Sequence, residues 1–190
     1  MIRKLSQPLL LCALTCILPL YSSAEANGVG LPKGPWSELF EVTSYELVTC
    51  PDGKSGLLTN LKQKTVPLRY HSARWCPTTE ANDGRVTQWR FTSYDDAGRK
   101  VDEGEYLETK MHGLWISWHP NGVKQAEGHY SEGEPIGSHT SWRDNGEIAV
   151  TMNYLDGKPD GIWVYRDSTG RIVKNVHWRL GKVISTEQFD

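Results

Sequence analysis

The chain has 190 residues, is rich in tryptophan, tyrosine and glycine, and carries a formal net charge of −2. This length accommodates one ordinary domain or one extended repeat array. Basic residues form no run or stripe, which disfavours binding to nucleic acid and electrostatic capture by an anionic membrane.

The first 26 residues have the pattern of a secretory signal peptide. Arg3 and Lys4 precede an apolar stretch of about a dozen residues, and small residues follow it. Cleavage after Ala24 and cleavage after Ala26 both fit this pattern. A retained signal anchor is the alternative, but the apolar stretch is shorter than the roughly 20 residues that span a bilayer. We therefore expect a protein that is periplasmic or secreted after cleavage.

Two of the four cysteines, Cys12 and Cys16, lie within the predicted signal peptide, which leaves Cys50 and Cys76. A pair of cysteines in an exported chain predicts one disulfide. Closing a loop of this size contributes about 3–4 kcal/mol in the chain-entropy description. Two isolated cysteines do not make a structural zinc site, and the sequence has no C-x-x-C redox pair.

The segment that follows the signal peptide is divided by composition. Residues 27–35 are rich in glycine and proline, and we expect a flexible leader. Residues 36–88 contain strand-like stretches on both sides of a Pro-Asp-Gly turn signal at 51–53. We predict a β-rich capping subdomain that the Cys50–Cys76 disulfide holds together.

From residue 89 to residue 190, the sequence repeats with a period of 24 residues. Several columns share this step, which is the signature of a repeat array. The glycine columns are Gly98, Gly122, Gly146 and Gly170; Gly113, Gly137 and Gly161; and Gly133, Gly157 and Gly181. An aromatic column contains Tyr106, Tyr130, Tyr154 and Trp178. The units are 89–112, 113–136, 137–160 and 161–184.

Each unit is predicted to be a β-hairpin. In the second unit, the strand-like segment 113–118 is rich in aromatic and branched residues and precedes a His-Pro-Asn-Gly turn. Residues 123–130 form the return strand, and 131–134 turn towards the next unit. One hairpin cannot bury its apolar face alone, so we predict an all-β fold in which antiparallel hairpins share one sheet.

The two-residue period of a strand assigns side chains to faces. On the third return strand, Ile148, Val150, Met152 and Tyr154 are expected to point to the same side. The aromatic column would then form a structural ladder across the sheet, made of Tyr106, Tyr130, Tyr154 and Trp178.

The first strands of the units carry two further columns, which period 2 places on opposite faces. One column contains Phe91, Trp115, His139 and Trp163, and the other contains Tyr94, Trp118, Trp142 and Arg166. A single sheet layer covers at most one face, so either 36–88 folds over the second face or an aromatic strip is exposed to a partner. The candidate partner-binding residues are Phe91, Trp115, Trp118, His139, Trp142 and Trp163.

The second unit has the pattern G-x-W-x-x-W…N-G…G-x-Y-x-x-G, which resembles the MORN-variant repeat. Its members are Gly113, Trp115, Trp118, Asn121, Gly122, Gly128, Tyr130 and Gly133. The resemblance covers residues 89–184, and such repeats are typical of bacterial YwqK-type antitoxins. MORN-like arrays also occur as scaffolds and membrane-apposed modules. The sequence departs from the pattern at Thr109, His139, Met152 and Val176.

Signatures of catalysis are absent from the sequence. It has no glycine-rich phosphate loop, nucleophile elbow or H-E-x-x-H motif, and its histidines are scattered over different repeat positions. We expect no metal and no cofactor. Two pairs of carboxylates, Asp95 with Asp96 and Glu103 with Glu105, are interpreted as turn and strand-face charges instead of an acid–base pair.

The leading hypothesis is an exported, non-catalytic protein-binding module of the immunity or antitoxin kind, which covers a toxin or effector. The first alternative is a cell-envelope scaffold that contacts membrane or cell wall through its aromatic strip. The second is a carbohydrate-active enzyme, since exposed aromatic rings can stack on sugars. The oligomeric state is left open, because exposed edge strands allow edge-to-edge pairing.

Overall fold

The computed structural model describes residues 40–63, 71–80 and 86–190. The predicted signal peptide, with both of its cleavage sites, and the predicted leader lie outside the described residues.

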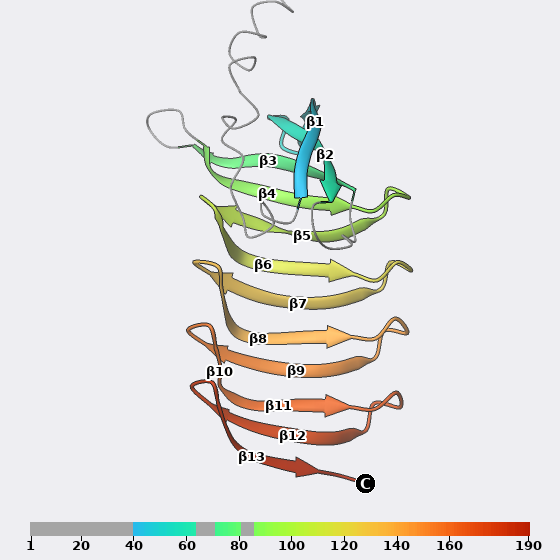
Figure 1. Ribbon diagram of the computed structural model, residues 1–190, viewed down its shortest axis with the longest axis vertical. Helices are drawn as coiled ribbons and strands as arrows, with labels where there is room; N and C mark the ends of the chain where they lie inside the picture. Colours follow the sequence, from blue (N-terminus) through green and yellow to red (C-terminus); the bar gives the residue numbers. More distant parts are fainter. Residues whose placement is uncertain (1–39, 64–70, 81–85) are drawn as a thin grey trace, which may run out of the picture. The chain divides into compact units, whose positions relative to one another are not determined.

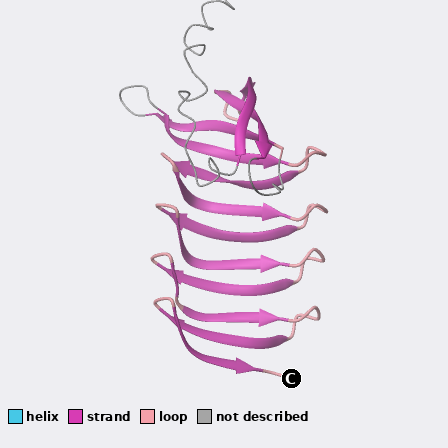
Figure 2. Ribbon diagram, viewed as in Figure 1, coloured by secondary structure: helices cyan, strands magenta, loops and turns pink. Residues whose placement is uncertain are grey.

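All secondary structure in the described part of the chain is β-strand, as the repeat pattern predicted (Figure 2). The 13 strands form one antiparallel sheet whose spatial order follows the chain, except that the short strand β10 pairs only with β9 (Figure 1). The strands are β1 (Phe40–Thr49), β2 (Ser55–Gln63), β3 (Ser72–Glu80), β4 (Val86–Tyr94), β5 (Lys100–Leu107), β6 (Lys110–Trp118), β7 (Lys124–Ser131), β8 (Glu134–Trp142), β9 (Ile148–Leu155), β10 (Lys158–Pro159), β11 (Gly161–Arg166), β12 (Ile172–Arg179) and β13 (Lys182–Gln188).

The strands that precede the repeats continue the same sheet. Strand β2 pairs with β3, and β3 pairs with the first repeat strand β4. The predicted disulfide is confirmed: Cys50, directly after β1, is bonded to Cys76 in β3, with a Cα–Cα distance of 5.8 Å. Gly56 faces this bond, and a Cβ atom there would lie 2.4 Å from the Cys50 sulfur. Strand β2 therefore packs against the disulfide at Gly56, where there is room only for glycine.

Two kinds of turn connect the strands of the repeats. Within the second unit, the Gly122 amide donates to the His119 carbonyl at 2.9 Å, and Gly122 has a φ of 84°. Between units, Glu132 and Gly133 have φ values of 53° and 85°. Two consecutive positive φ values are the requirement of a type I′ hairpin loop, in which glycine carries no steric cost. The turns lie within the predicted segments 119–122 and 131–134, whereas β6 begins at Lys110, three residues before the predicted start of its unit.

Register shifts next to the turns change which face a side chain occupies. Trp142 of β8 pairs with Ile148 of β9, whereas the neighbouring Ser141 pairs with Val150. Strand β9 therefore carries one extra residue between these two pairs. The prediction that Ile148 shares a face with Val150 and Tyr154 is therefore wrong. A bulge breaks the two-residue alternation locally, and period-2 reasoning does not anticipate it.

Buried apolar side chains are concentrated at the N-terminal end of the sheet. They are Cys50, Leu57, Ala73, Trp75, Cys76, Trp89, Phe91, Val101, Tyr106 and, in the last unit, Val176. From β6 onward, most side chains are half-buried or exposed, and every residue of β13 is exposed. Both faces of the C-terminal repeats are thus accessible within the described part of the chain.

The described residues include no helix of the length and apolarity needed to cross a membrane.

Candidate functional site

One face of the sheet, which we call the ladder face, carries a continuous row of rings that contact each other edge to face or at a tilt. The predicted column is present, but its members alternate with rings from the first strands of the units. The ring-centroid distances are 5.1 Å for Tyr106–Trp115, 6.5 Å for Trp115–Tyr130, 5.2 Å for Tyr130–His139, 4.8 Å for His139–Tyr154, 5.3 Å for Tyr154–Trp163 and 5.2 Å for Trp163–Trp178. Strands two apart are separated by roughly 9.6 Å, so the intervening ring fills a gap that successive tyrosines cannot bridge.

The first-strand rings of three units are held by the same hydrogen bond. Each ring N–H points to the backbone carbonyl ten residues before it. The bonds are Trp115 Nε1 to Glu105 at 3.1 Å, His139 Nε2 to His129 at 3.0 Å, and Trp163 Nε1 to Asn153 at 3.0 Å. Since the three bonds repeat with the sequence period, ring orientation is built into the repeat unit.

Two of these rings, Trp115 and His139, pack directly against glycines on the preceding strand. A Cβ atom on Gly104 would be 2.2 Å from the Trp115 ring, and one on Gly128 would be 2.0 Å from the His139 ring. Real Cβ atoms do not approach other atoms so closely. The glycines of the repeat motif are therefore required by ring packing at these two positions, which keep a negative φ.

His139 takes the place of a tryptophan and keeps its hydrogen bond. A carbonyl oxygen only accepts, so Nε2 carries the proton that is donated to His129. The residue is 8% exposed, and its burial lowers the pKa of the imidazole below 6.5. We therefore assign it as neutral at neutral pH. Its burial leaves little of its ring for a partner to touch.

The candidate partner-binding residues of this face differ in accessibility. Phe91 is only 2% exposed and lies against Trp75, whereas Trp115 and Trp163 are half-buried. Next to the rings the sheet carries small side chains, and a hollow of about 150 Å³ is lined by residues that include Trp115 and Ala126. A partner docking on this face would meet ring edges beside a shallow trough.

The opposite face presents Trp118 and Trp142, as the alternation of the strands predicted. Cationic side chains lie over the aromatic rings: Arg74 is 5.9 Å from the Tyr94 ring centroid, Lys100 is 4.9 Å from Trp118, and Lys124 is 5.2 Å from Trp142. Strand pairing places Tyr94 beside Lys100 and Trp118 beside Lys124. We call this alternating set the cation–aromatic row; it consists of Arg74, Tyr94, Lys100, Trp118, Lys124 and Trp142.

Each lysine of the row also pairs with a carboxylate on its own strand. Lys100 Nζ lies 2.7 Å from Glu103, and Lys124 Nζ lies 2.5 Å from Glu127. Sequence reasoning missed the lysines of this site, although their spacing of 24 residues was the available signal. The pattern ends one unit later, where Ile148 takes the place of the lysine.

A hollow of about 380 Å³ lies beside the middle of the cation–aromatic row. It is lined by Arg99, Lys100, Trp118, Pro120, Asn121 and Gly122. The turn between β4 and β5 and the turn between β6 and β7 thus contribute to one surface depression.

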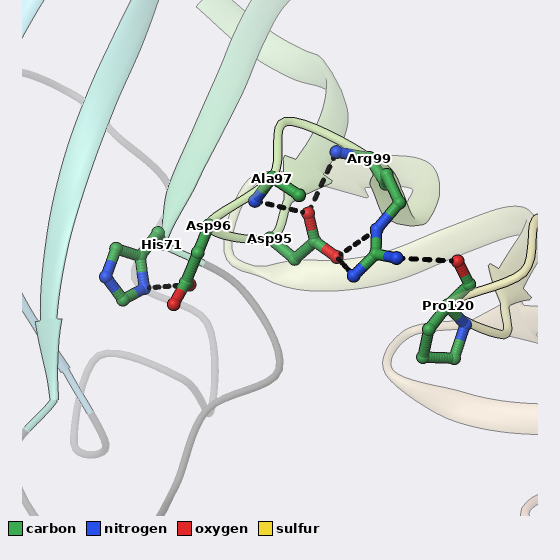
Figure 3. A network of polar contacts seen from close by, with 6 residues as sticks. All are labelled: His71, Asp95, Asp96, Ala97, Arg99 and Pro120. Atoms are coloured by element: carbon green, nitrogen blue, oxygen red, sulfur yellow. Dashed lines mark hydrogen bonds and ion pairs between the residues drawn. The ribbon is translucent and has the colours of Figure 1, made fainter.

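The carboxylate pairs proposed as an acid–base alternative are engaged in structural contacts. Asp95 accepts hydrogen bonds from the Ala97 and Arg99 amides, both at 2.9 Å, and from the Arg99 guanidinium (Figure 3). The Arg99 amide bond is the largest cause that lowers the pKa of Asp95. Arg99 also donates to the Pro120 carbonyl at 3.0 Å, and Asp96 pairs with His71 at 2.7 Å. This network caps one turn and ties it to the next.

The other pair, Glu103 and Glu105, is engaged on the strand face. Glu103 pairs with Lys100, while Glu105 lies 3.7 Å from Arg90 and accepts a 2.6 Å hydrogen bond from Gln88. Among the described residues, no three histidine, cysteine, aspartate or glutamate side chains are grouped closely enough to hold a metal ion.

Comparison with known proteins does not identify a family for this chain. No protein-family model matches the sequence, and no curated protein matches it. Among solved structures, the chain is similar to a point mutant of S. aureus TarM, crystallised in complex with Fondaparinux, alpha-GlcNAc-glycerol and UDP, at 10% identity and a TM-score of 0.39. The match covers 76% of this chain and 27% of that one, so this chain spans about a quarter of its length. A likeness at this level carries no argument about function.

Proposed function

We propose that this protein is exported, is not an enzyme, and binds a protein partner through its ladder face, as an immunity or antitoxin-type inhibitor. Export is supported by the signal-peptide pattern, and a disulfide is compatible with an oxidising compartment. The inhibitor role is supported by the resemblance of the repeats to MORN-variant repeats of YwqK-type antitoxins.

The observation that carries the proposal is the accessibility of the ladder in the C-terminal repeats. Trp115, Tyr130, Tyr154, Trp163 and Trp178 are half-buried, and no second layer of described residues covers them. Tryptophan and tyrosine are the residue types that most often anchor protein interfaces.

The ladder rings are also held in place before any partner arrives. Each ring contacts its neighbours, and the Trp115 and Trp163 indoles donate to backbone carbonyls. Binding therefore costs little side-chain entropy, which favours affinity. The inhibitor would act by steric cover of its partner and needs no chemistry of its own.

Two substitutions on opposite faces test the proposal. Ala126 lies on the ladder face, because it pairs with Ser117 and Ser141, whereas Ser138 is exposed on the other face, where it pairs with Asn153. We expect the Ala126→Glu variant to lose the partner and the matched Ser138→Glu variant to keep it.

The measurement is co-purification with the product of a neighbouring gene, together with survival of cells that express that product. Circular dichroism should show that both variants are folded. Absence of any partner, absence of protection, or equal binding by the two variants would refute the proposed function.

A further inference from the structure

We infer that the cation–aromatic row binds a β-1,4-linked polysaccharide chain that runs across the strands of the sheet. This site lies on the face opposite the ladder, and the inference does not depend on the proposed protein partner.

The spacing of the three rings matches the repeat of such a polysaccharide. Tyr94, Trp118 and Trp142 lie on β4, β6 and β8, so neighbouring rings are two strands, or roughly 9.6 Å, apart. In a β-1,4-linked chain each sugar is flipped relative to the next, and the same pyranose face therefore recurs every second sugar at nearly this distance. The C–H face of a pyranose is apolar and gains by packing on an aromatic ring. Three rings in register thus match alternate sugars of one chain.

The polar groups between the rings recur with the same period. Lys100 with Glu103 and Lys124 with Glu127 supply donors and acceptors at the places where sugar hydroxyls would lie. Because each ammonium is paired with a carboxylate, the row is close to electrically neutral at these positions. This pairing favours a ligand rich in hydroxyl groups over a polyanion.

The lysines leave room for a sugar without a change in the backbone. Their side chains are 42% and 39% exposed, so each ammonium can move off its tryptophan while it remains near its glutamate. The hollow beside Trp118, an open depression of about 380 Å³, lies where a ring substituent of the central sugar would be placed.

The row has a defined end, which predicts a length dependence. In the next unit Ile148 and Arg166 occupy the lysine and tryptophan positions, and they pair with Trp142 and Ile172 on the same face. The three rings span four strand spacings, roughly 19 Å, or about five sugars. Affinity is expected to rise up to about this length and then to level off.

The test uses the mature chain and soluble chito- and cello-oligosaccharides of increasing length, with binding measured by titration calorimetry. We expect Trp118→Ala and Trp142→Ala each to weaken binding about tenfold, the effect of removing one aromatic anchor. The double variant Ile148→Lys/Arg166→Trp extends the row by one ring and should bind longer oligosaccharides about tenfold more tightly.

The extended variant separates a binding role from a structural one, because loss of fold cannot produce a gain in affinity. Thermal melts establish that each variant is folded. Failure of the wild-type chain to bind either oligosaccharide series, unchanged affinity in both alanine variants, or no gain in the extended variant would overturn the inference. Binding only to a polyanion such as heparin, abolished by salt, would also overturn it.

The same experiment separates this inference from the proposed function. Ala126→Glu, on the ladder face, should leave oligosaccharide binding unchanged while it removes the protein partner. Trp118→Ala should have the opposite pattern, so that either idea can fail alone.

Discussion

Gly128→Ala is the sharpest test of why the repeat needs glycine beneath its ladder. The added Cβ would lie between 2.0 and 2.4 Å from three atoms of the His139 ring. That ring cannot slide aside freely, because Tyr130 and Tyr154 pack against it and Nε2 donates to the His129 carbonyl. Strand β8, which carries His139, must move away or the ring must leave its rotamer.

The expected cost follows from three contributions. Overpacking of a well-filled site costs about 1–3 kcal/mol, and a strained or broken ring hydrogen bond adds about 1 kcal/mol. Replacing a strand glycine by alanine returns about 0.5–1 kcal/mol of backbone entropy. We expect a net loss of about 2 kcal/mol, or a fall in the melting temperature of about 4–8 °C for a domain of this size.

The assay is chemical denaturation followed by circular dichroism and by tryptophan fluorescence, in the wild-type and His139→Ala backgrounds. Removing the ring removes the clash, so Gly128→Ala should become neutral or slightly stabilising in the second background. The same loss in both backgrounds would show that the glycine is needed for some reason other than ring packing.

Three further predictions follow from the described contacts. Replacing Cys50 and Cys76 by serine should lower the free energy of unfolding by about 3.5 kcal/mol, from a sequence separation of 26 residues, and reduction of the wild-type chain should have the same effect in the same denaturation assay. Because burial lowers the pKa of His139, the neutral ring stabilises the fold above pH 6.5, and this contribution is lost as the pH falls from 6.5 towards the lowered pKa. The His139→Trp variant should lose this pH dependence in thermal melts. An unchanged profile would contradict the assignment. The hydrogen bond from the Thr169 hydroxyl is the main cause that lowers the pKa of Asp167 to about 2. The Asp167 carboxylate therefore stabilises the fold above pH 3.8, and this effect is lost as the pH falls towards 2. In an Asp167→Asn variant, the melting temperature should depend less on pH across that range.

The repeat period, the hairpins and the disulfide were accessible from the sequence because each has a local cause. Turns that need a positive φ select glycine, which marks the unit length at Gly122 and Gly146. Two cysteines downstream of the predicted signal peptide leave one pairing. These signals act within a few residues or within one unit, and pattern reasoning can follow them.

The interleaving of the two aromatic columns was not accessible in this way. Gly113 has a φ of 67°, and the pairing between β5 and β6 shifts beside it. This shift lets Trp115 lean over Gly104 and join the tyrosine column, and the equivalent shift between β7 and β8 places His139 over Gly128. Phe91 and His139 are buried instead of exposed to a partner. The face of Ile148 was mistaken for a different reason, since the bulge between β8 and β9 changes the face of a side chain without changing the spacing of the sequence.

The sequence alone determined that this protein is a row of hairpins with one disulfide, because backbone turns and periodic burial are properties of short segments. Only the tertiary structure decided which rings touch and which cations lie over Trp118 and Trp142. Those contacts join residues on different strands, and they depend on the register of one strand against the next. A shift of one residue moves a side chain to the other face of the sheet, and with it the surface that the protein can offer to a ligand.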